Sequence, residues 1–285
     1  MFGINYVATK HVLETVPAQA WVFLRVGTAT LLLAPVVFAL YRRLPPRGTR
    51  LPLALAACLG VVANQILFTE GLARTTPAHS SVLNASIPVQ TLLFAVLAGQ
   101  ERFTLRKVVA IGVALTGVLT LLEVDRMVGE GIHFETTMVG DLLSLGNAAT
   151  FSLFLVLMRR FGRDVDPLLA TGWSFVVATP LLFAWSLPAL DAKTFAAVTA
   201  AGVWPVALFV VVGATIVTYV LNNWALRRTH SSQVALYIYV QPVVATLLSV
   251  ALGIESPGAR FFVAASLVFG GILIEISGRS SRSTA

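Results

Sequence analysis

The chain has 285 residues, of which 57% are hydrophobic and 12% are charged. Soluble domains carry roughly 25% charged residues, because most of their surface must be wetted. This composition excludes a soluble globular domain and predicts a chain whose surface faces lipid. The net charge is +7, but the basic residues lie in short segments between apolar runs, so no nucleic-acid partner is expected.

Apolar stretches of roughly 17–25 residues with few charges are long enough to cross the hydrocarbon core of a bilayer. We therefore expect an all-α integral membrane protein with ten transmembrane helices. The first is short, since about 15 residues reach only about 22 Å as a helix. The predicted spans are 1–15, 18–41, 52–73, 78–98, 105–122, 137–159, 167–187, 199–224, 230–252 and 259–276.

The basic residues predict the orientation, because cytoplasmic loops of membrane proteins carry an excess of Lys and Arg. If the chain starts in the cytoplasm, 14 of its 20 Lys and Arg residues fall in cytoplasmic segments. Both termini are then cytoplasmic, with a tail at 278–285, and a bacterial inner membrane is the expected location. No separate signal peptide is predicted. The lone Cys58 has no partner for an internal disulfide.

An internal repeat appears when the chain is shifted by 154 positions. Matches in valine or leucine mean little in apolar stretches, whereas proline, glycine, glutamate and arginine at one fixed offset are informative. The informative pairs are Pro88 with Pro242, Gly99 with Gly253, Glu101 with Glu255, Arg106 with Arg260 and Gly117 with Gly271. We expect one repeat at 1–124 and another at 136–277. Because each holds five spans, the second sits upside down relative to the first, an arrangement common in secondary transporters.

Several segments together resemble the EamA-like branch of the drug/metabolite transporter superfamily. They are Gly3 to Lys10, Arg25, the stretches from Pro88 to Glu101 and from Pro242 to Glu255, and Gly140-Asp141-Leu142-Leu143. The resemblance covers essentially all ten spans. It implies a ten-helix carrier that exports or exchanges amino acids or related metabolites, while relatives carry drugs, nucleotide sugars or lipid-linked sugars. Drug or lipid-linked sugar export is therefore the alternative, because substrate does not follow from fold.

Polar groups inside a membrane need partners, so they are expected to face the bundle interior or a watery cavity. In the first span Asn5 and Thr9 share one helix face, and Asn5 is a candidate for substrate binding. Lys10 is either a charge partner for the substrate or pairs with Glu14 near the outer membrane interface, where the two side chains snorkel. Arg25 either binds a carboxylate through two parallel hydrogen bonds or ties neighbouring helices together.

The third and eighth spans each combine an amide with an aromatic ring. Asn64 and Phe68 share one face of the third span, and Tyr219 and Asn223 lie together in the eighth. This combination suits a small amphipathic ligand, and equally suits hydrogen bonds between helices. Glu70 lies one turn before Arg74, so it is a candidate for proton coupling or one half of an interfacial ion pair.

The fourth and ninth spans each contain a proline, which removes one backbone donor and frees a carbonyl of the preceding turn. Freed carbonyls are tolerated in a membrane where they line a cavity or gain partners from other helices. A kink needed only for packing is the alternative. The flanking candidates for substrate binding are Asn84, Gln90, Tyr237, Tyr239 and Gln241.

The sixth span places Asn147 on one face with Gly140 and Ser144, whose small size lets helices approach closely. Asn147 is a further candidate for substrate binding. Asp141 is a candidate coupling group, or a charge stabilised at a helix N-terminus. Trp173 in the seventh span either stacks on substrate or belongs to the aromatic belt at the membrane interface.

Rival functions have weaker support. An intramembrane enzyme needs a nucleophile with its base or clustered metal ligands, and the four histidines show no ligand spacing. No cofactor or metal is expected. A channel needs a ring of filter residues, which a two-fold repeat does not offer. The expected partners are a small-molecule substrate and the lipid bilayer, in a monomer or homodimer.

Overall fold

The computed structural model describes all residues except 1, 76, 122–133, 242, 245–258 and 278–285. Within this described part the secondary structure is helical and no strand occurs, which confirms the all-α class. The expected tail at 278–285 and the second half of the expected ninth span lie outside the described residues.

The helices follow the predicted order. They are α1 (Phe2–Leu13), α2 (Ala18–Tyr41), α3 (Arg47–Ala57), η1 (Cys58–Ala63), α4 (Asn64–Arg74), α5 (Pro77–Asn84), α6 (Ile87–Leu97), α7 (Leu105–Leu121), α9 (Phe134–Leu157), η2 (Met158–Gly162), α10 (Pro167–Ser186), η3 (Leu187–Ala189), α11 (Ala192–Thr199), α12 (Trp204–Phe209), η4 (Val210–Val217), α13 (Thr218–Leu226), α14 (Ser231–Leu236), η5 (Tyr237–Tyr239) and α16 (Ala259–Ser277). The segments η1, η2 and η4 are π-helical.

Two predicted boundaries were wrong. The third span begins at Arg47 rather than 52, because Pro46 occupies the N-cap and its fixed φ allows a helix to start directly after it. The eighth span begins at Trp204 rather than 199. A separate helix, α11, precedes it, and the Asp191 carboxylate caps α11 by accepting a hydrogen bond from the Thr194 backbone N–H.

Within the described part of the chain, six helices are long and apolar enough to cross a membrane: Ala18–Tyr41, Arg47–Arg74, Ser80–Leu97, Met138–Gly162, Pro167–Ala189 and Trp204–Leu226. Helices α1 and α7 are shorter, with 12 and 17 residues. Large apolar side chains such as Leu31, Leu97 and Leu105 are at least three-quarters exposed. Exposure of this extent suits lipid, which removes the energetic penalty that water imposes on it.

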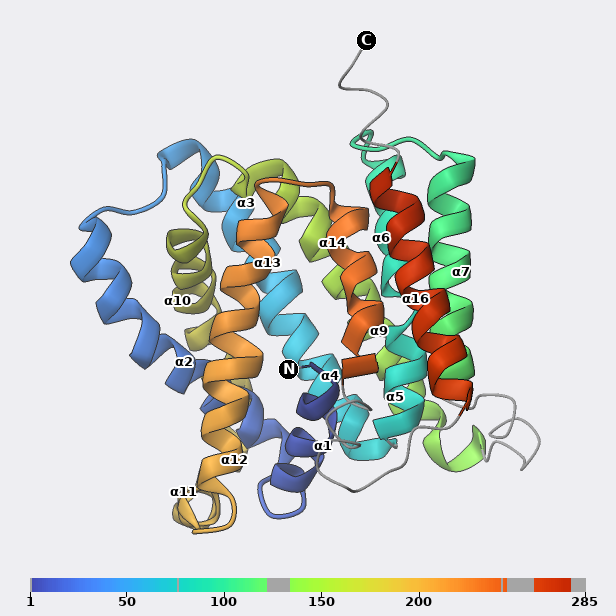
Figure 1. Ribbon diagram of the computed structural model, residues 1–285. Helices are drawn as coiled ribbons and strands as arrows, with labels where there is room; N and C mark the ends of the chain where they lie inside the picture. Colours follow the sequence, from blue (N-terminus) through green and yellow to red (C-terminus); the bar gives the residue numbers. More distant parts are fainter. Residues whose placement is uncertain (1, 76, 122–133, 242, 245–258, 278–285) are drawn as a thin grey trace.

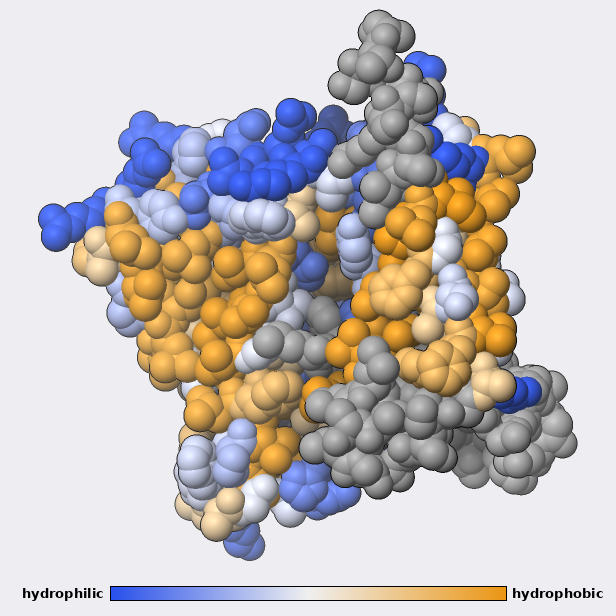
Figure 2. Space-filling view, in the orientation of Figure 1, coloured by the Kyte–Doolittle hydropathy of each residue, from blue (hydrophilic) through white to orange (hydrophobic). Residues whose placement is uncertain are grey.

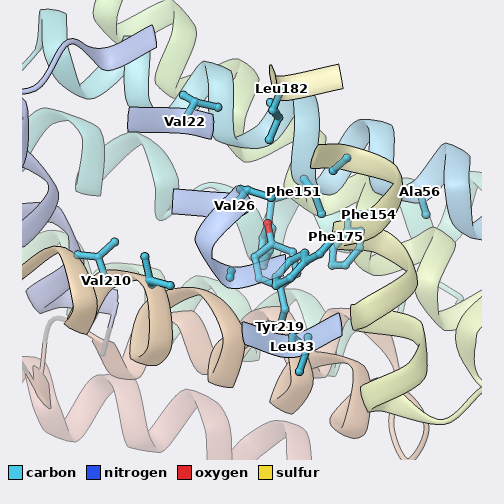
Figure 3. Packing of buried hydrophobic residues seen from close by; sticks show 14 of the residues in the cluster. Val22, Val26, Leu33, Ala56, Phe151, Phe154, Phe175, Leu182, Val210 and Tyr219 are labelled. Carbon is cyan, nitrogen blue, oxygen red and sulfur yellow. The ribbon is translucent and has the colours of Figure 1, made fainter. Parts of the chain in front are cut away.

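The helices pack around two apolar clusters, and α6 and α14 contribute to both (Figure 1). The larger cluster joins α2, α3, α9, α10, η4 and α13, and Figure 3 shows its centre around Phe151, Phe154, Phe175 and Tyr219. The smaller cluster joins α6, α7, α14, η5 and α16. The strongest packing between distant parts of the chain pairs α7 with α16, α2 with α10 and α4 with α9.

One end of the bundle is basic. The ends of α2, α6, η2 and α13 gather at the top of Figure 1, and Figure 2 shows a hydrophilic cap there above an apolar belt. At this end the Glu101 carboxylate lies between α6 and α7. It accepts hydrogen bonds from Lys107, from the Ser231 hydroxyl at 3.0 Å and from the Ser232 backbone N–H at 3.1 Å. Glu101 thereby fixes the α6–α7 turn against the N-terminus of α14.

Candidate functional site

A central cavity lies within the bundle and is lined by helices from both halves of the chain. Its described lining is Asn5, Tyr6, Arg25, Asn64, Gln65, Phe68, Asn84, Ile87, Asn147, Phe151, Ala214, Tyr219, Ile238 and Gln241. The space that a water-sized molecule can occupy is about 50 Å³. In this conformation the cavity therefore has room for a few water molecules, because one water needs roughly 10–15 Å³ by this measure.

Arg25 is the charged side chain among the described residues of this lining, and it is 2% exposed. Its Nε donates to the Thr215 hydroxyl at 2.6 Å and its Nη2 donates to the Ala214 carbonyl at 3.4 Å. Its guanidinium carbon lies 5.9 Å from the centre of the Phe68 ring, within the range of a cation–π contact. The remaining nitrogen, Nη1, is buried without a hydrogen-bond partner.

Two π-helical segments supply the backbone carbonyls of the site. In η4 the Ala214 carbonyl meets Arg25, and in η1 the Gly60 carbonyl accepts the Tyr219 hydroxyl at 2.5 Å. A π-helical turn displaces carbonyls from the regular i→i+4 ladder and frequently marks functional sites. The 154-residue shift places Gly60 on Ala214. Equivalent backbone carbonyls in the two halves of the chain therefore accept hydrogen bonds from side chains of the site.

Tyr219 also joins Gln65 and the aromatic core. The Gln65 amide nitrogen donates to the Tyr219 hydroxyl oxygen at 3.4 Å. The Tyr219 ring packs edge-on against Phe154 and Phe175, with ring centres 5.6 and 5.3 Å apart (Figure 3). Phe154 in turn lies directly on Gly60, where a Cβ would collide with its ring. The phenol is thus held rigidly at the wall of the cavity.

Asn64 and Asn147 form a reciprocal pair across α4 and α9. Each side-chain amide donates to the other's backbone carbonyl, at 3.2 and 3.0 Å. The predicted close approach occurs about two to three turns away, where a Cβ on Gly140 would lie 2.8 Å from the Arg74 carbonyl oxygen. Both asparagines line the cavity, although their amide N–H groups already serve to join the two helices.

Seven of the twelve sequence-predicted binding residues meet in this cavity. They are Asn5, Asn64, Phe68, Asn84, Asn147, Tyr219 and Gln241, together with Arg25 from the candidate charge partners. Asn5 accepts a hydrogen bond from Thr9 at 3.2 Å, and Asn84 donates to the Ser80 carbonyl at 2.9 Å. They come from α1, α2, α4, α5, α9 and α13 and from the residues after η5.

An apolar cavity adjoins the central one and shares Phe151, Ile238 and Gln241 with it. Its water-sized space is about 360 Å³. The predicted Tyr237 lines this second cavity rather than the first. Its walls come from α9, α13, α14 and η5, and the face drawn in Figure 2 is hollowed between α13 and α14.

The other predicted binding residues lie elsewhere. Gln90 donates to the Ser86 hydroxyl at 2.7 Å, and Asn223 donates to the Thr171 hydroxyl at 2.8 Å. Trp173 donates from its indole to the Arg50 carbonyl at 3.2 Å, at the basic end of the bundle. Tyr239 is buried in the smaller apolar cluster. Sequence periodicity placed these residues in helices but did not indicate which neighbour each one faces.

The remaining charged candidates lie outside the central cavity. Lys10 donates to the Leu72 and Thr75 carbonyls at 2.7 and 3.0 Å, so it caps the C-terminal end of α4 instead of pairing with Glu14. Glu70 forms the predicted ion pair with Arg74. Asp141 accepts from the Thr75 hydroxyl at 2.6 Å. Since α9 begins at Phe134, Asp141 is not the N-terminal charge of that helix.

The lining residues that were not among the sequence-predicted candidates are Tyr6, Gln65, Ile87, Phe151, Ala214 and Ile238. The repeat carried a signal for Gln65, because the 154-residue shift places it on the predicted Tyr219. The apolar members gave no signal, since isoleucine and phenylalanine are ordinary in any membrane span. Among the described residues, no group of three or more His, Cys, Asp or Glu side chains is placed to hold a metal ion.

Comparison with known proteins gives a consistent result. The model of the EamA-like transporter family matches residues 1–122 and 138–276. The chain is 26% identical over 195 residues to the uncharacterized transporter YyaM of Bacillus subtilis and 33% identical over 187 residues to the chloroplastic WAT1-related protein At3g02690 of Arabidopsis thaliana. These matches cover 68% and 64% of this chain, and 63% and 44% of the two relatives.

A solved crystal structure shares the fold. It superposes with a TM-score of 0.69 and 18% sequence identity, covering 96% of this chain and 95% of that chain. A likeness at this identity shows the fold alone.

Proposed function

Because the chain belongs to the EamA-like transporter family, we propose that it carries small amphipathic metabolites through the central cavity by alternating access. The family match and the relative of Bacillus subtilis that is named as a transporter support a multi-pass membrane transporter of the drug/metabolite transporter superfamily, with a small-molecule substrate. The observation that carries the mechanism is the buried cavity, which is lined by polar side chains from both halves of the chain.

Two inverted repeats of five spans, ten in all, are part of this proposal. Their support includes a reciprocal contact between α7 and α16. A Cβ on Gly117 would lie 2.8 Å from the Ala264 carbonyl oxygen, and a Cβ on Gly271 would lie 2.5 Å from that of Ala110. The 154-residue shift exchanges the two contacts, as a two-fold axis between repeats requires. Such symmetry lets one fold open to either side by exchanging the conformations of its halves.

Amino acids and related compounds are the substrates we propose first, and export or exchange is the proposed direction. Drug or lipid-linked sugar export is the second candidate, favoured by the adjoining apolar cavity between α13 and α14. We also propose a bacterial inner membrane with both termini in the cytoplasm, and no enzymatic activity. The oligomeric state, a monomer or a homodimer, stays a prediction.

We propose exchange without proton coupling. Glu70 and Asp141, the two carboxylates selected for coupling, pair with Arg74 and Thr75 outside the described lining of the cavity. A coupling carboxylate must be reached by both proton and substrate, which these positions do not provide.

Counterflow in liposomes tests the proposal. Purified protein is reconstituted, the liposomes are loaded with unlabelled amino acids, hydroxy acids or sugars in separate pools, and uptake of the matching labelled pool is followed with and without a pH gradient. We expect uptake of at least one pool above protein-free liposomes, with no effect of the gradient. Absence of counterflow for every pool contradicts the proposal.

A matched pair of variants on η4 links uptake to the cavity. Ala214→Leu adds bulk to the lining, whereas Val212→Leu adds bulk on the same helix where the side chain is 39% exposed and lies outside the lining. We expect the first variant to lose counterflow and the second to keep it. Equal uptake by both variants would place the transport path elsewhere.

A further inference from the structure

We propose that the central cavity recognises α-amino and α-hydroxy acids through two specific atoms, Nη1 of Arg25 and Oε1 of Gln65. The substrate carboxylate binds the Arg25 nitrogen, and the α-ammonium or α-hydroxyl donates to the Gln65 oxygen. This inference rests on the proposed transport function, whose site it defines chemically.

The proposed contact between the substrate carboxylate and Arg25 follows from the hydrogen bonds that the three guanidinium nitrogens make. The Thr215 hydroxyl donates its own proton to the Val210 carbonyl at 2.9 Å, so it accepts from Arg25 Nε. Nη2 is directed at the Ala214 carbonyl. Nη1 is left buried and unpartnered, on a side chain that lines the cavity. A buried cation with an unsatisfied N–H group is costly, and a carboxylate ligand supplies both the missing acceptor and the opposite charge.

The proposed contact between the substrate donor and Gln65 follows from the fact that the Tyr219 hydroxyl has only one proton to donate. That proton is used on the Gly60 carbonyl at 2.5 Å, so toward Gln65 the phenol oxygen acts as an acceptor. Gln65 must therefore turn its NH₂ group toward Tyr219. This arrangement leaves Oε1 buried without a partner. A carbonyl-type oxygen in this position accepts an N–H or O–H donor.

The two unpartnered atoms have opposite roles in one cavity. Arg25 offers a charged donor and Gln65 offers an acceptor, so the complementary ligand joins an anionic acceptor to a neighbouring donor. A carboxylate with an α-ammonium or α-hydroxyl group has this arrangement. A cationic drug lacks the anion, and a neutral sugar leaves the Arg25 charge unbalanced. The described apolar lining, which includes Ile87, Phe151 and Ile238, is suited to an apolar side chain.

Thermal stability of the detergent-purified protein tests the recognition with four probes of one side-chain shape. They are L-leucine, 2-hydroxy-4-methylpentanoate, 4-methylpentanoate and L-leucinamide. A ligand that binds only the folded state raises its apparent melting temperature. We expect the first two to bind at least about tenfold more tightly than the last two, because a site built to hydrogen-bond a group rejects analogues that lack it. The alanine and phenylalanine series extend the test to smaller and larger side chains.

Variants assign the two contacts separately. Arg25→Gln removes the charge and is expected to abolish the preference for leucine over leucinamide. Gln65→Met keeps the side-chain volume and is expected to abolish the preference for leucine over 4-methylpentanoate while keeping the preference for the carboxylate. Gln90→Met, outside the lining, is the matched control and retains both preferences. If Arg25→Gln does not fold, the Gln65→Met result stands alone as the test.

Equal binding of the four probes, or no stabilisation by any acid of the three series, overturns the proposal. Unchanged selectivity in Gln65→Met also overturns it. These failures are distinguishable from failure of the transport function, because counterflow of a sugar pool together with absent acid binding leaves a carrier with a different substrate class.

Discussion

Gln65 and Tyr219 stand 154 positions apart in the chain and are joined by a hydrogen bond of 3.4 Å in the wall of the central cavity. The same spacing relates Pro88 to Pro242 and Gly117 to Gly271 along the sequence. Two repeat-related residues can meet directly only where they lie close to the axis that relates the repeats. The contact therefore supports a cavity placed on that axis, where inverted repeats commonly build their substrate sites.

Tyr219→Phe is expected to destabilise the protein by about 1–3 kcal/mol, because the Gly60 carbonyl and the Gln65 amide are then buried without a partner. Thermal unfolding of the purified protein measures the effect. Tyr237→Phe is the matched control, since the Tyr237 side chain is 53% exposed and its change is expected to be close to neutral. Equal melting temperatures for the two variants would show that the Tyr219 hydroxyl contributes nothing to the core.

Gly271→Ala is expected to separate α7 from α16, because a Cβ at this position would lie 2.5 Å from the Ala110 carbonyl oxygen and 2.7 Å from the Ala114 Cβ. Backbone atoms cannot move aside cheaply, so we expect a loss of about 1–3 kcal/mol, the usual effect of overpacking.

Gly270→Ala provides the neighbouring control. A Cβ there meets nothing within 4 Å, and alanine is a better helix former than glycine by about 1 kcal/mol. Melting temperatures of the two variants should therefore change in opposite directions. A stabilised Gly271→Ala variant would contradict the packing of α7 against α16.

Glu101 is expected to make stability depend on pH in the acidic range. Burial alone raises the pKa of this carboxyl, but hydrogen bonds from Lys107 and Ser232 outweigh it and lower the pKa below its ordinary value of 4.5. A carboxyl with a lowered folded-state pKa contributes stability that is fully present above 4.5 and is lost as pH falls through the folded-state value.

Melting temperatures of wild type and Glu101→Gln between pH 7 and pH 3 measure this contribution. The variant is expected to lose about 3 kcal/mol at pH 7, because Lys107 is left without its buried partner, and to show a smaller further loss in acid. Glu14→Gln is the control, since the Glu14 side chain is 64% exposed. Parallel pH profiles for wild type and Glu101→Gln would contradict the role of Glu101.

Membrane orientation can be tested by cysteine labelling in a Cys58→Ser background. Arg43 belongs to the connection between α2 and α3 and Lys193 belongs to α11, and Figure 1 shows this connection and α11 at opposite ends of the bundle. In intact cells we expect an impermeant maleimide to label Lys193→Cys and to leave Arg43→Cys unlabelled until the membrane is opened. The reverse pattern would reject the proposed cytoplasmic location of the basic end.

The sequence by itself determined the class of protein and most of its helices. Apolar runs of spanning length fix helices in lipid, since every backbone N–H and C=O must be satisfied within the segment. Prolines and capping aspartates then mark several helix starts, as at α3, α10 and α11. The fixed 154-residue offset could be found without coordinates, because proline, glycine and charged residues are scarce enough in such runs for their matches to be informative. These features of the sequence indicate the family without any knowledge of how the helices pack.

Only the tertiary structure decided which polar residues share a cavity. Helical periodicity places Asn64 and Phe68 on one face, but it does not state which helix that face meets. Asn223 and Tyr239 had the same polar signature as Tyr219 and lie outside the described lining. The unpartnered atoms of Arg25 and Gln65 follow from contacts with η4, α13 and η1, which are made by residues far apart in the chain. A partner's identity is set by packing between helices, and no pattern within one helix records it.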